Sequence, residues 1–192
     1  MKKLHKKGSL VMLVMGILIV ALLAAGCANL KGQNNNENGD MQEQPGVSAD
    51  PQKTPVNVTL YFSDDQAMYL VTEEREVMKQ GETMEEVVIR ELIKGPQEPG
   101  NMRTIPEEAR LISVEVVDGV AYVNFSKEFK TKHWGGTAGE SHTLYSVVNS
   151  LTELEGIEKV QFLLEGDTMD SLGGHMDTSQ PIAPDAPELL SQ

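Results

Sequence analysis

Three histidines in the second half of the sequence, His133, His142 and His175, are the side chains best suited to catalysis or metal binding. Zinc sites use histidine and cysteine side chains at fixed spacings, for example two histidines four residues apart on a helix. No two of these histidines have that spacing, and none is paired with a cysteine. His175 and Asp177 could supply two metal ligands, but a polar turn at the surface is the commoner explanation of such a pair. The sequence therefore predicts no metal site and no cofactor.

Two further motifs could bind or activate a substrate. The segment GGTAGES, residues 135–141, precedes a predicted helix, and the backbone amides of such a glycine-rich start can bind an anion. The segment lacks the Gly-Lys-Ser/Thr ending of a phosphate-binding loop, and Glu140 lies where a phosphate would approach. Ser141 and His142 are consecutive, so on a helix their side chains point about 100° apart and do not form a nucleophile and base. We expect no catalytic residue and no enzymatic activity.

Acidic residues dominate the charge of the chain. The acidic pairs Asp64-Asp65 and Glu73-Glu74 could join a calcium site, but a solvated surface is the commoner explanation of such pairs. The formal net charge is −13, and all 29 acidic residues follow Cys27. From Cys27 onward there are 12 basic and 29 acidic residues, a formal charge of −17. Such a surface repels phosphate backbones, so we expect no nucleic-acid partner.

Cys27, the only cysteine, follows an uncharged apolar run over residues 10–26 and a basic N-terminus. A basic head and an apolar run are typical of a secretory signal, although the run is also near the lower limit for a membrane-spanning helix. The small residues Ala24, Ala25 and Gly26 directly before Cys27 resemble a bacterial lipobox, in which the cysteine thiol is joined to diacylglycerol and becomes the new N-terminus. Residues 1–26 are thus predicted to be a lipoprotein signal peptide.

The segment after the predicted lipidation site, residues 27–54, is rich in Asn, Gln, Gly and Glu and has almost no apolar residue to bury. Such a composition is typical of a flexible tether. We therefore expect a protein held by lipid on the outer face of the cytoplasmic membrane, with a folded domain over residues 55–180 and a disordered tail over 181–192.

Hydrophobic periodicity predicts an α+β fold for that domain. Alternation predicts two hairpins, the second around Asp118-Gly119, a pair that favours the tight turn matching strand twist. Thr83 and Glu86 form a capping-box motif before the first helix, and Gly95 and Gly156 end the two helices. The expected architecture is a two-layer sandwich in which a mixed β-sheet carries both helices on one face. The predicted order is strand, strand, helix, strand, strand, helix and strand, over residues 56–62, 68–77, 84–94, 111–117, 120–125, 140–155 and 158–166.

The sequence contains, in this order, the motifs LIKGP (92–96), IP (105–106), DG (118–119) and VNFS (123–126), followed by Asn149, Gly156 and Gly166. Their order and spacing resemble the GerMN domain of sporulation and spore-germination lipoproteins. The resemblance covers about residues 56–170 and implies a cell-envelope protein that acts through protein contacts, with no agreed catalytic residues. It also implies the helix and strand order of ring-building modules, which assemble into channel complexes, so oligomerisation is compatible with it.

The expected contact surface for an envelope protein partner is a sheet edge or the glycine-rich connection that contains Trp134, Gly135 and Gly136. Trp134 is the one large aromatic residue expected at the surface, although a tryptophan can equally belong to the core. The alternative function is an extracytoplasmic lipoprotein that binds a small ligand or a cell-wall fragment, which would require a sizeable concave pocket.

Overall fold

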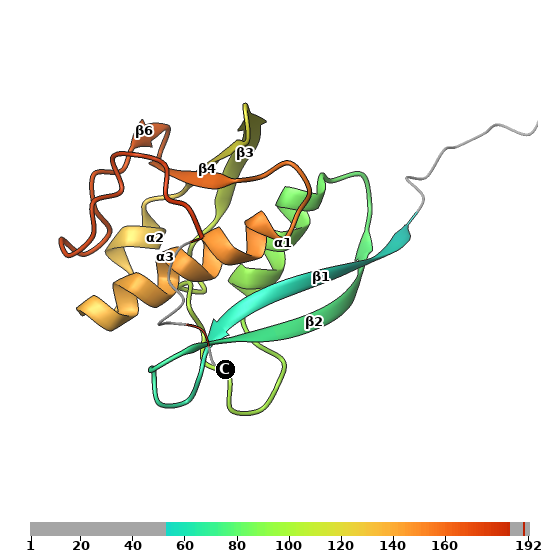
Figure 1. The fold of residues 1–192 in the computed structure, drawn as a ribbon, viewed down its shortest axis with the longest axis horizontal. Helices are drawn as coiled ribbons and strands as arrows, with labels where there is room; N and C mark the ends of the chain where they lie inside the picture. Colours follow the sequence, from blue (N-terminus) through green and yellow to red (C-terminus); the bar gives the residue numbers. More distant parts are fainter. Residues whose placement is uncertain (1–52, 185–189, 191–192) are drawn as a thin grey trace, which may run out of the picture. The chain divides into compact units, whose positions relative to one another are not determined.

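A computed structural model describes residues 53–184 and residue 190 (Figure 1). The predicted signal peptide, Cys27, most of the predicted tether, and residues 185–189 and 191–192 of the predicted tail lie outside the described residues. The elements in the described part of the chain are β1 (Thr54–Ser63), β2 (Leu70–Lys79), α1 (Met84–Lys94), β3 (Leu111–Val117), β4 (Val120–Phe125), α2 (Glu128–Thr131), α3 (Thr137–Thr152), β5 (Lys159–Leu164) and β6 (Asp167–Thr168).

The α+β class is confirmed, and the strands form two sheets. One sheet has the order β3-β4-β5-β6 and is mixed, because β4 and β5 are parallel whereas the other neighbours are antiparallel. The β1-β2 hairpin forms a separate two-stranded sheet. Helices α1 and α3 lie between the hairpin and the mixed sheet (Figure 1). The mixed sheet carries both long helices on one face, as predicted, but the expected two-layer arrangement is corrected, because the hairpin forms a third layer on the other side of the helices.

The hairpin stays apart from the mixed sheet because the outer edge of β1 bonds to α3. Ser146 and Ser150 are four residues apart and so lie on one face of that helix. The Ser146 hydroxyl donates to the backbone oxygen of Tyr61 at 2.5 Å, and the backbone N–H of Tyr61 donates to the Ser150 hydroxyl at 3.0 Å. Side chains of a helix thus satisfy the edge groups that a neighbouring strand would otherwise use.

Two local sequence signals form the structures predicted from them. The Thr83 hydroxyl accepts from the Glu86 N–H, and the Glu86 carboxylate accepts from the Thr83 N–H at 2.8 Å, so the capping box at the start of α1 is complete. In the β3-β4 hairpin, Asp118 and Gly119 both have positive φ, 50° and 79°. Positive φ at both central residues is the geometry of the tight turn that Asp-Gly favours.

Helix α3 is buried on nearly every side from Glu140 to Leu151 because it lies between the two sheets. It begins at Thr137, earlier than the predicted start at residue 140, and the short helix α2 and strand β6 were not predicted. Beyond the predicted domain end at residue 180, Ile182 forms a β-bridge with Val160, with N–H to oxygen distances of 2.8 and 2.9 Å.

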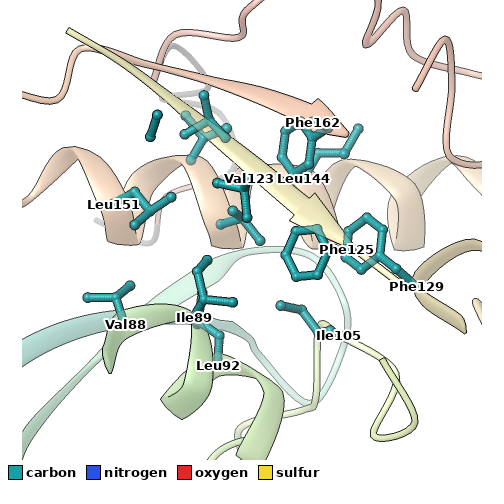
Figure 2. Close-up of a cluster of buried hydrophobic side chains, with 14 of the residues drawn as sticks. Val88, Ile89, Leu92, Ile105, Val123, Phe125, Phe129, Leu144, Leu151 and Phe162 are labelled. Carbon is teal, nitrogen blue, oxygen red and sulfur yellow. The ribbon is translucent and has the colours of Figure 1, made fainter. Parts of the chain in front are cut away.

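The hydrophobic core is built around the two long helices from residues of the mixed sheet, the helices and the β1-β2 hairpin (Figure 2). The rings of Phe125 and Phe129 stack at a centroid distance of 4.1 Å, which joins β4 to α2. Alternation in β1 places Val58, Leu60 and Phe62 in the core, as predicted from their spacing. Figure 2 shows the contributions of the other elements, which include Val88, Ile89, Leu92, Ile105, Val123, Leu144, Leu151 and Phe162.

A buried ionic network joins β2 to α1 and shows that one of the acidic pairs is only partly a solvated surface. Glu73, Arg75 and Glu91 are all less than 10% exposed, and the Arg75 guanidinium lies 2.5 Å from the Glu73 carboxylate and 3.3 Å from that of Glu91. Burial raises the pKa of the Glu73 carboxyl, but Arg75 and the amides of Glu98 and Gln97 together lower it below its ordinary value. Glu73 therefore has a structural role, because it holds the loop that follows α1.

Candidate functional site

A cavity of about 360 Å³ lies at the turn end of the β1-β2 hairpin. Three segments that are distant in the sequence line it: the end of β1 with its turn, the loop before β3, and the start of α3 with the residues that precede it. We name it the Trp134 pocket. Its lining residues are Ser63, Asp65, Ala67, Met102, Arg103, Thr104, Trp134, Gly139 and His142.

Asp64 holds the hairpin turn that forms one wall of the pocket. Its carboxylate accepts hydrogen bonds from the N–H groups of Met68 and Tyr69 at 2.7 and 3.0 Å. Desolvation raises the pKa of this carboxyl, but the Tyr69 and Met68 amides outweigh it, so the pKa lies below its ordinary value. The two residues of the acidic pair Asp64-Asp65 thus have different roles, since Asp64 shapes the turn and Asp65 lines the pocket.

Arg103 attaches the second wall to the end of α1. The N–H of Met102 donates to the backbone oxygen of Ser63 at 2.7 Å, which extends the end of β1. The Arg103 guanidinium donates to the backbone oxygens of Ile93 and Lys94, and a cation at this position complements the negative end of the helix dipole. A Cβ on Gly95 would lie 2.7 Å from Arg103 Nη2, so the glycine leaves space for the guanidinium.

Trp134 is held in place by contacts on both sides, although 52% of its surface is exposed. Its ring stacks on His133 at a centroid distance of 4.9 Å, and a Cβ on Gly139 would lie 2.8 Å from its Nε1. His133 Nδ1 accepts from the Gly135 N–H at 3.0 Å, so in the neutral ring Nε2 carries the proton and donates to the Thr143 hydroxyl at 2.9 Å. Burial lowers the pKa of His133 and so favours this neutral form.

His142 forms the buried floor of the pocket and is 4% exposed. Its Nδ1 lies 2.9 Å from the Ser63 hydroxyl, and that hydroxyl donates to the backbone oxygen of Asp64 at 3.0 Å. Because the single Ser63 hydroxyl proton is used in this way, His142 Nδ1 is the donor of the pair and Nε2 is the acceptor. Burial lowers the pKa of His142, and Asp64 opposes that shift. The geometry differs from that of a nucleophile and base, in which serine donates to histidine.

The remaining candidate residues have structural contacts. Glu140 is fully buried, and its carboxylate accepts from the N–H groups of His175 and Met176 and from the hydroxyl of Ser171, so it holds the loop over residues 171–176. The Asp177 carboxylate accepts from the N–H and the hydroxyl of Ser179. Among residues 53–184 and 190, no three His, Cys, Asp or Glu side chains converge as a metal site would require.

Two large, exposed apolar side chains line the Trp134 pocket. They are Met102 and Trp134, which are 53 and 52% exposed, and Met68 and Tyr69, 54 and 40% exposed, follow the lining residue Ala67 in the chain. Gly135 and Gly136 adopt positive φ, 78° and 84°, where the chain turns from Trp134 into α3. Of the predicted contact residues, Trp134 therefore lines the pocket, and the two glycines position it.

The fold and this site define an α+β domain with an apolar pocket and, in its described part, no assembled catalytic group. The model of the Germane family, described as sporulation and spore germination, matches residues 59–170. The chain belongs to this family, and the resemblance to GerMN domains found in the sequence is confirmed.

Three solved structures are similar to this chain. The first GerMN domain of the Bacillus subtilis sporulation protein GerM has 23% identity over 68% of this chain and 96% of its own, with a TM-score of 0.55. The tandem GerMN domains of the same protein have 21% identity over 77% of this chain and 50% of theirs, with a TM-score of 0.54. A candidate lipoprotein from Clostridium perfringens has 28% identity over 71% of this chain and 93% of its own, with a TM-score of 0.48.

A search of curated proteins gave no match. Within the described residues, none of the helices has both the length and the apolar character needed to cross a bilayer.

Proposed function

We propose that this protein is a GerMN-domain lipoprotein of the cell envelope that binds another envelope protein through the Trp134 pocket, in sporulation or spore germination. The observation that carries the proposal is a cavity lined by two large, exposed apolar side chains, Met102 and Trp134, on an otherwise acidic protein. The family match supports the biological setting. The domain acts by contact and catalyses no reaction.

The pocket has the properties of a protein-binding site. Tryptophan is enriched among the residues that dominate binding energy, and such residues lie in pockets that exclude water. Burying one large apolar side chain contributes roughly 1.5 to 3 kcal/mol. Because His133 and Gly139 restrict the Trp134 ring in the free protein, little ordering cost remains when a partner binds.

Anchoring through Cys27 would bring this pocket to partners near the membrane. A flexible chain of the length of residues 27–54 has a root-mean-square reach of roughly 25 to 30 Å. The protein then lies on the outer face of the cytoplasmic membrane, with its domain close to the bilayer surface. Cys27→Ala is expected to release the protein from the membrane fraction. Retention of this variant in that fraction would contradict lipid anchoring.

The binding proposal is tested by placing a photoreactive amino acid at position 134 in living cells and identifying crosslinked proteins. We expect one envelope protein to be recovered repeatedly. The yield should fall when a crosslinker at position 102 is combined with Trp134→Ala or with Gly139→Ala, which displaces the indole ring. A crosslinker at Met78, which is 50% exposed on β2, is the matched control. Equal recovery from positions 78 and 134 would refute the proposal.

A second candidate function is the binding of a small molecule or cell-wall fragment. The pocket volume of about 360 Å³ is large enough for such a ligand, and His142, Arg103 and Asp65 offer polar contacts. Thermal shifts of the purified protein with defined muropeptides would distinguish the two functions. A shift that Trp134→Ala abolishes, without a protein crosslink, would favour ligand binding.

A further inference from the structure

Strand β3 has an unused edge that is independent of the Trp134 pocket. It is the terminal strand of the mixed sheet, and its outer edge pairs with no other strand among the described residues. It lies on the opposite side of the helices from the β1-β2 hairpin (Figure 1). On β3 and its hairpin partner, Ile112, Val116, Val117 and Tyr122 are 49, 40, 51 and 37% exposed.

The sequence of β3 gives this edge little protection against pairing. Exposed edge strands usually carry lysine or proline, or are very short, because their free N–H and C=O groups can bind another strand. Over its seven residues, LISVEVV, β3 contains neither proline nor lysine, and Glu115 is its one charged residue. The register irregularity falls at Ile112, between Leu111 and Ser113, and the strand pairs regularly with β4 from Ser113 to Val117.

The strand is also complementary to itself when two copies run antiparallel about Val114. In that register Ile112 of one copy lies opposite Val116 of the other, so two exposed apolar side chains meet. Glu115 lies opposite Ser113, so the two carboxylates do not face each other. Arg110 directly precedes β3 and Asp118 directly follows it, so at each end of the pair the arginine of one copy lies near the aspartate of the other, because a two-fold axis repeats every contact. A register shifted to Glu115 would instead place two carboxylates face to face.

We propose that two copies of this protein associate by antiparallel pairing of their β3 edges about a two-fold axis at Val114. The two mixed sheets then form one continuous sheet across the pair. The pairing removes the exposed edge of each copy and leaves both Trp134 pockets free. The occupant is a second copy because antiparallel pairing of residues 110–118 with the same residues of another copy brings opposite charges together and keeps like charges apart.

Cysteine crosslinking of the full-length protein in cell membranes tests the register. Directly opposite residues in antiparallel strands have Cα atoms about 4.5 to 5.5 Å apart, which a disulfide can span. Val114→Cys should therefore form a disulfide-linked dimer on its own. Differently tagged Ile112→Cys and Val116→Cys chains should crosslink when they are expressed together. Either variant alone should not, because identical positions would lie about 13 Å apart along the strands.

Two controls are needed. The native chain, whose one cysteine is Cys27, reports disulfides that form elsewhere, and Met78→Cys reports disulfides that form by random collision. Adding Val116→Lys to Val114→Cys should abolish the dimer, because it places a charge opposite Ile112 of the other copy. Absence of the Val114→Cys dimer, or equal dimer yields from Val114→Cys and Met78→Cys, would overturn the proposal. A crosslink to a protein of different mass would overturn it in favour of a foreign strand.

Discussion

Replacing Arg75 with methionine tests the buried network between β2 and α1. The guanidinium is almost fully buried and donates to the Glu73 carboxylate at 2.6 Å and to the backbone oxygen of Gly95 at 2.7 Å. It also lies 5.2 Å from the centre of the Phe62 ring. Methionine fills similar space without charge, so the variant leaves two buried carboxylates and two carbonyl oxygens, those of Glu91 and Gly95, without this donor.

The expected loss of unfolding free energy depends on the hydrogen bonds that Glu73 and Glu91 keep in the variant. Breaking one side of a buried ion pair costs about 3 to 5 kcal/mol. The lower end applies here, because Glu73 still accepts from the Gln97 and Glu98 amides and Glu91 still lies 2.6 Å from Lys94. We expect Arg75→Met to lower the free energy of unfolding by about 3 kcal/mol and the melting temperature by roughly 10 °C.

Urea and thermal unfolding of a form beginning at residue 28, followed by circular dichroism, measure this effect. Arg110→Met is the matched control: the Arg110 side chain is 73% exposed and lies 3.6 Å from Glu128, so its loss should cost less than about 1 kcal/mol. The difference between the two variants should shrink below about pH 4, as Glu73 and Glu91 become protonated. If Arg75→Met is no more destabilising than Arg110→Met at neutral pH, the network does not stabilise the domain.

Three further predictions concern stability. Burial lowers the pKa of both His133 and His142, so the stability that depends on their neutral forms is complete above about pH 6.5 and is lost as the pH falls from there toward their lowered pKa. The urea midpoint should therefore fall over that range, and it should fall less in His133→Gln. Gly173→Ala should cost about 1 to 3 kcal/mol by urea unfolding, because the added Cβ would lie 2.9 Å from the buried Glu140 carboxylate; an unchanged midpoint would refute this contact. Ser150→Ala should cost about 1 to 3 kcal/mol by leaving the Tyr61 N–H without its acceptor, and hydrogen exchange at Tyr61 should then accelerate.

Local signals predicted most elements well. The capping box at Thr83, the Asp118-Gly119 turn and the alternation in β1 each depend on a few neighbouring residues, so the sequence is sufficient to identify them. The separate β1-β2 sheet depends on Ser146 and Ser150 reaching Tyr61, more than 80 residues away in the sequence. Hydroxyls within a helix give no signal of such a partner, so the sequence alone could not predict the extra layer.

The candidate site was predicted only in part. Trp134 was identified because it is the one tryptophan in the chain. Met68, Tyr69 and Met102 were missed, because only the folded chain brings the hairpin turn and the loop before β3 beside Trp134. A signal was present in the turn, where Met68 and Tyr69 are adjacent apolar residues directly after a polar segment. Glu73 was assigned to a solvated surface because its burial depends on Arg75 and on the loop after α1.

Strand β1 also has a mechanical consequence. It runs from Thr54, where the predicted tether ends, to Ser63, which lines the Trp134 pocket, a distance of about 33 Å for ten residues. With the chain anchored at Cys27 and a partner held at the pocket, tension between them acts lengthwise on β1. All ten residues of β1 pair with β2, so the cross-strand hydrogen bonds are sheared together instead of being opened one by one. If the proposed anchor and the proposed partner are both engaged, the domain would therefore stay folded while it transmits a pulling force between them.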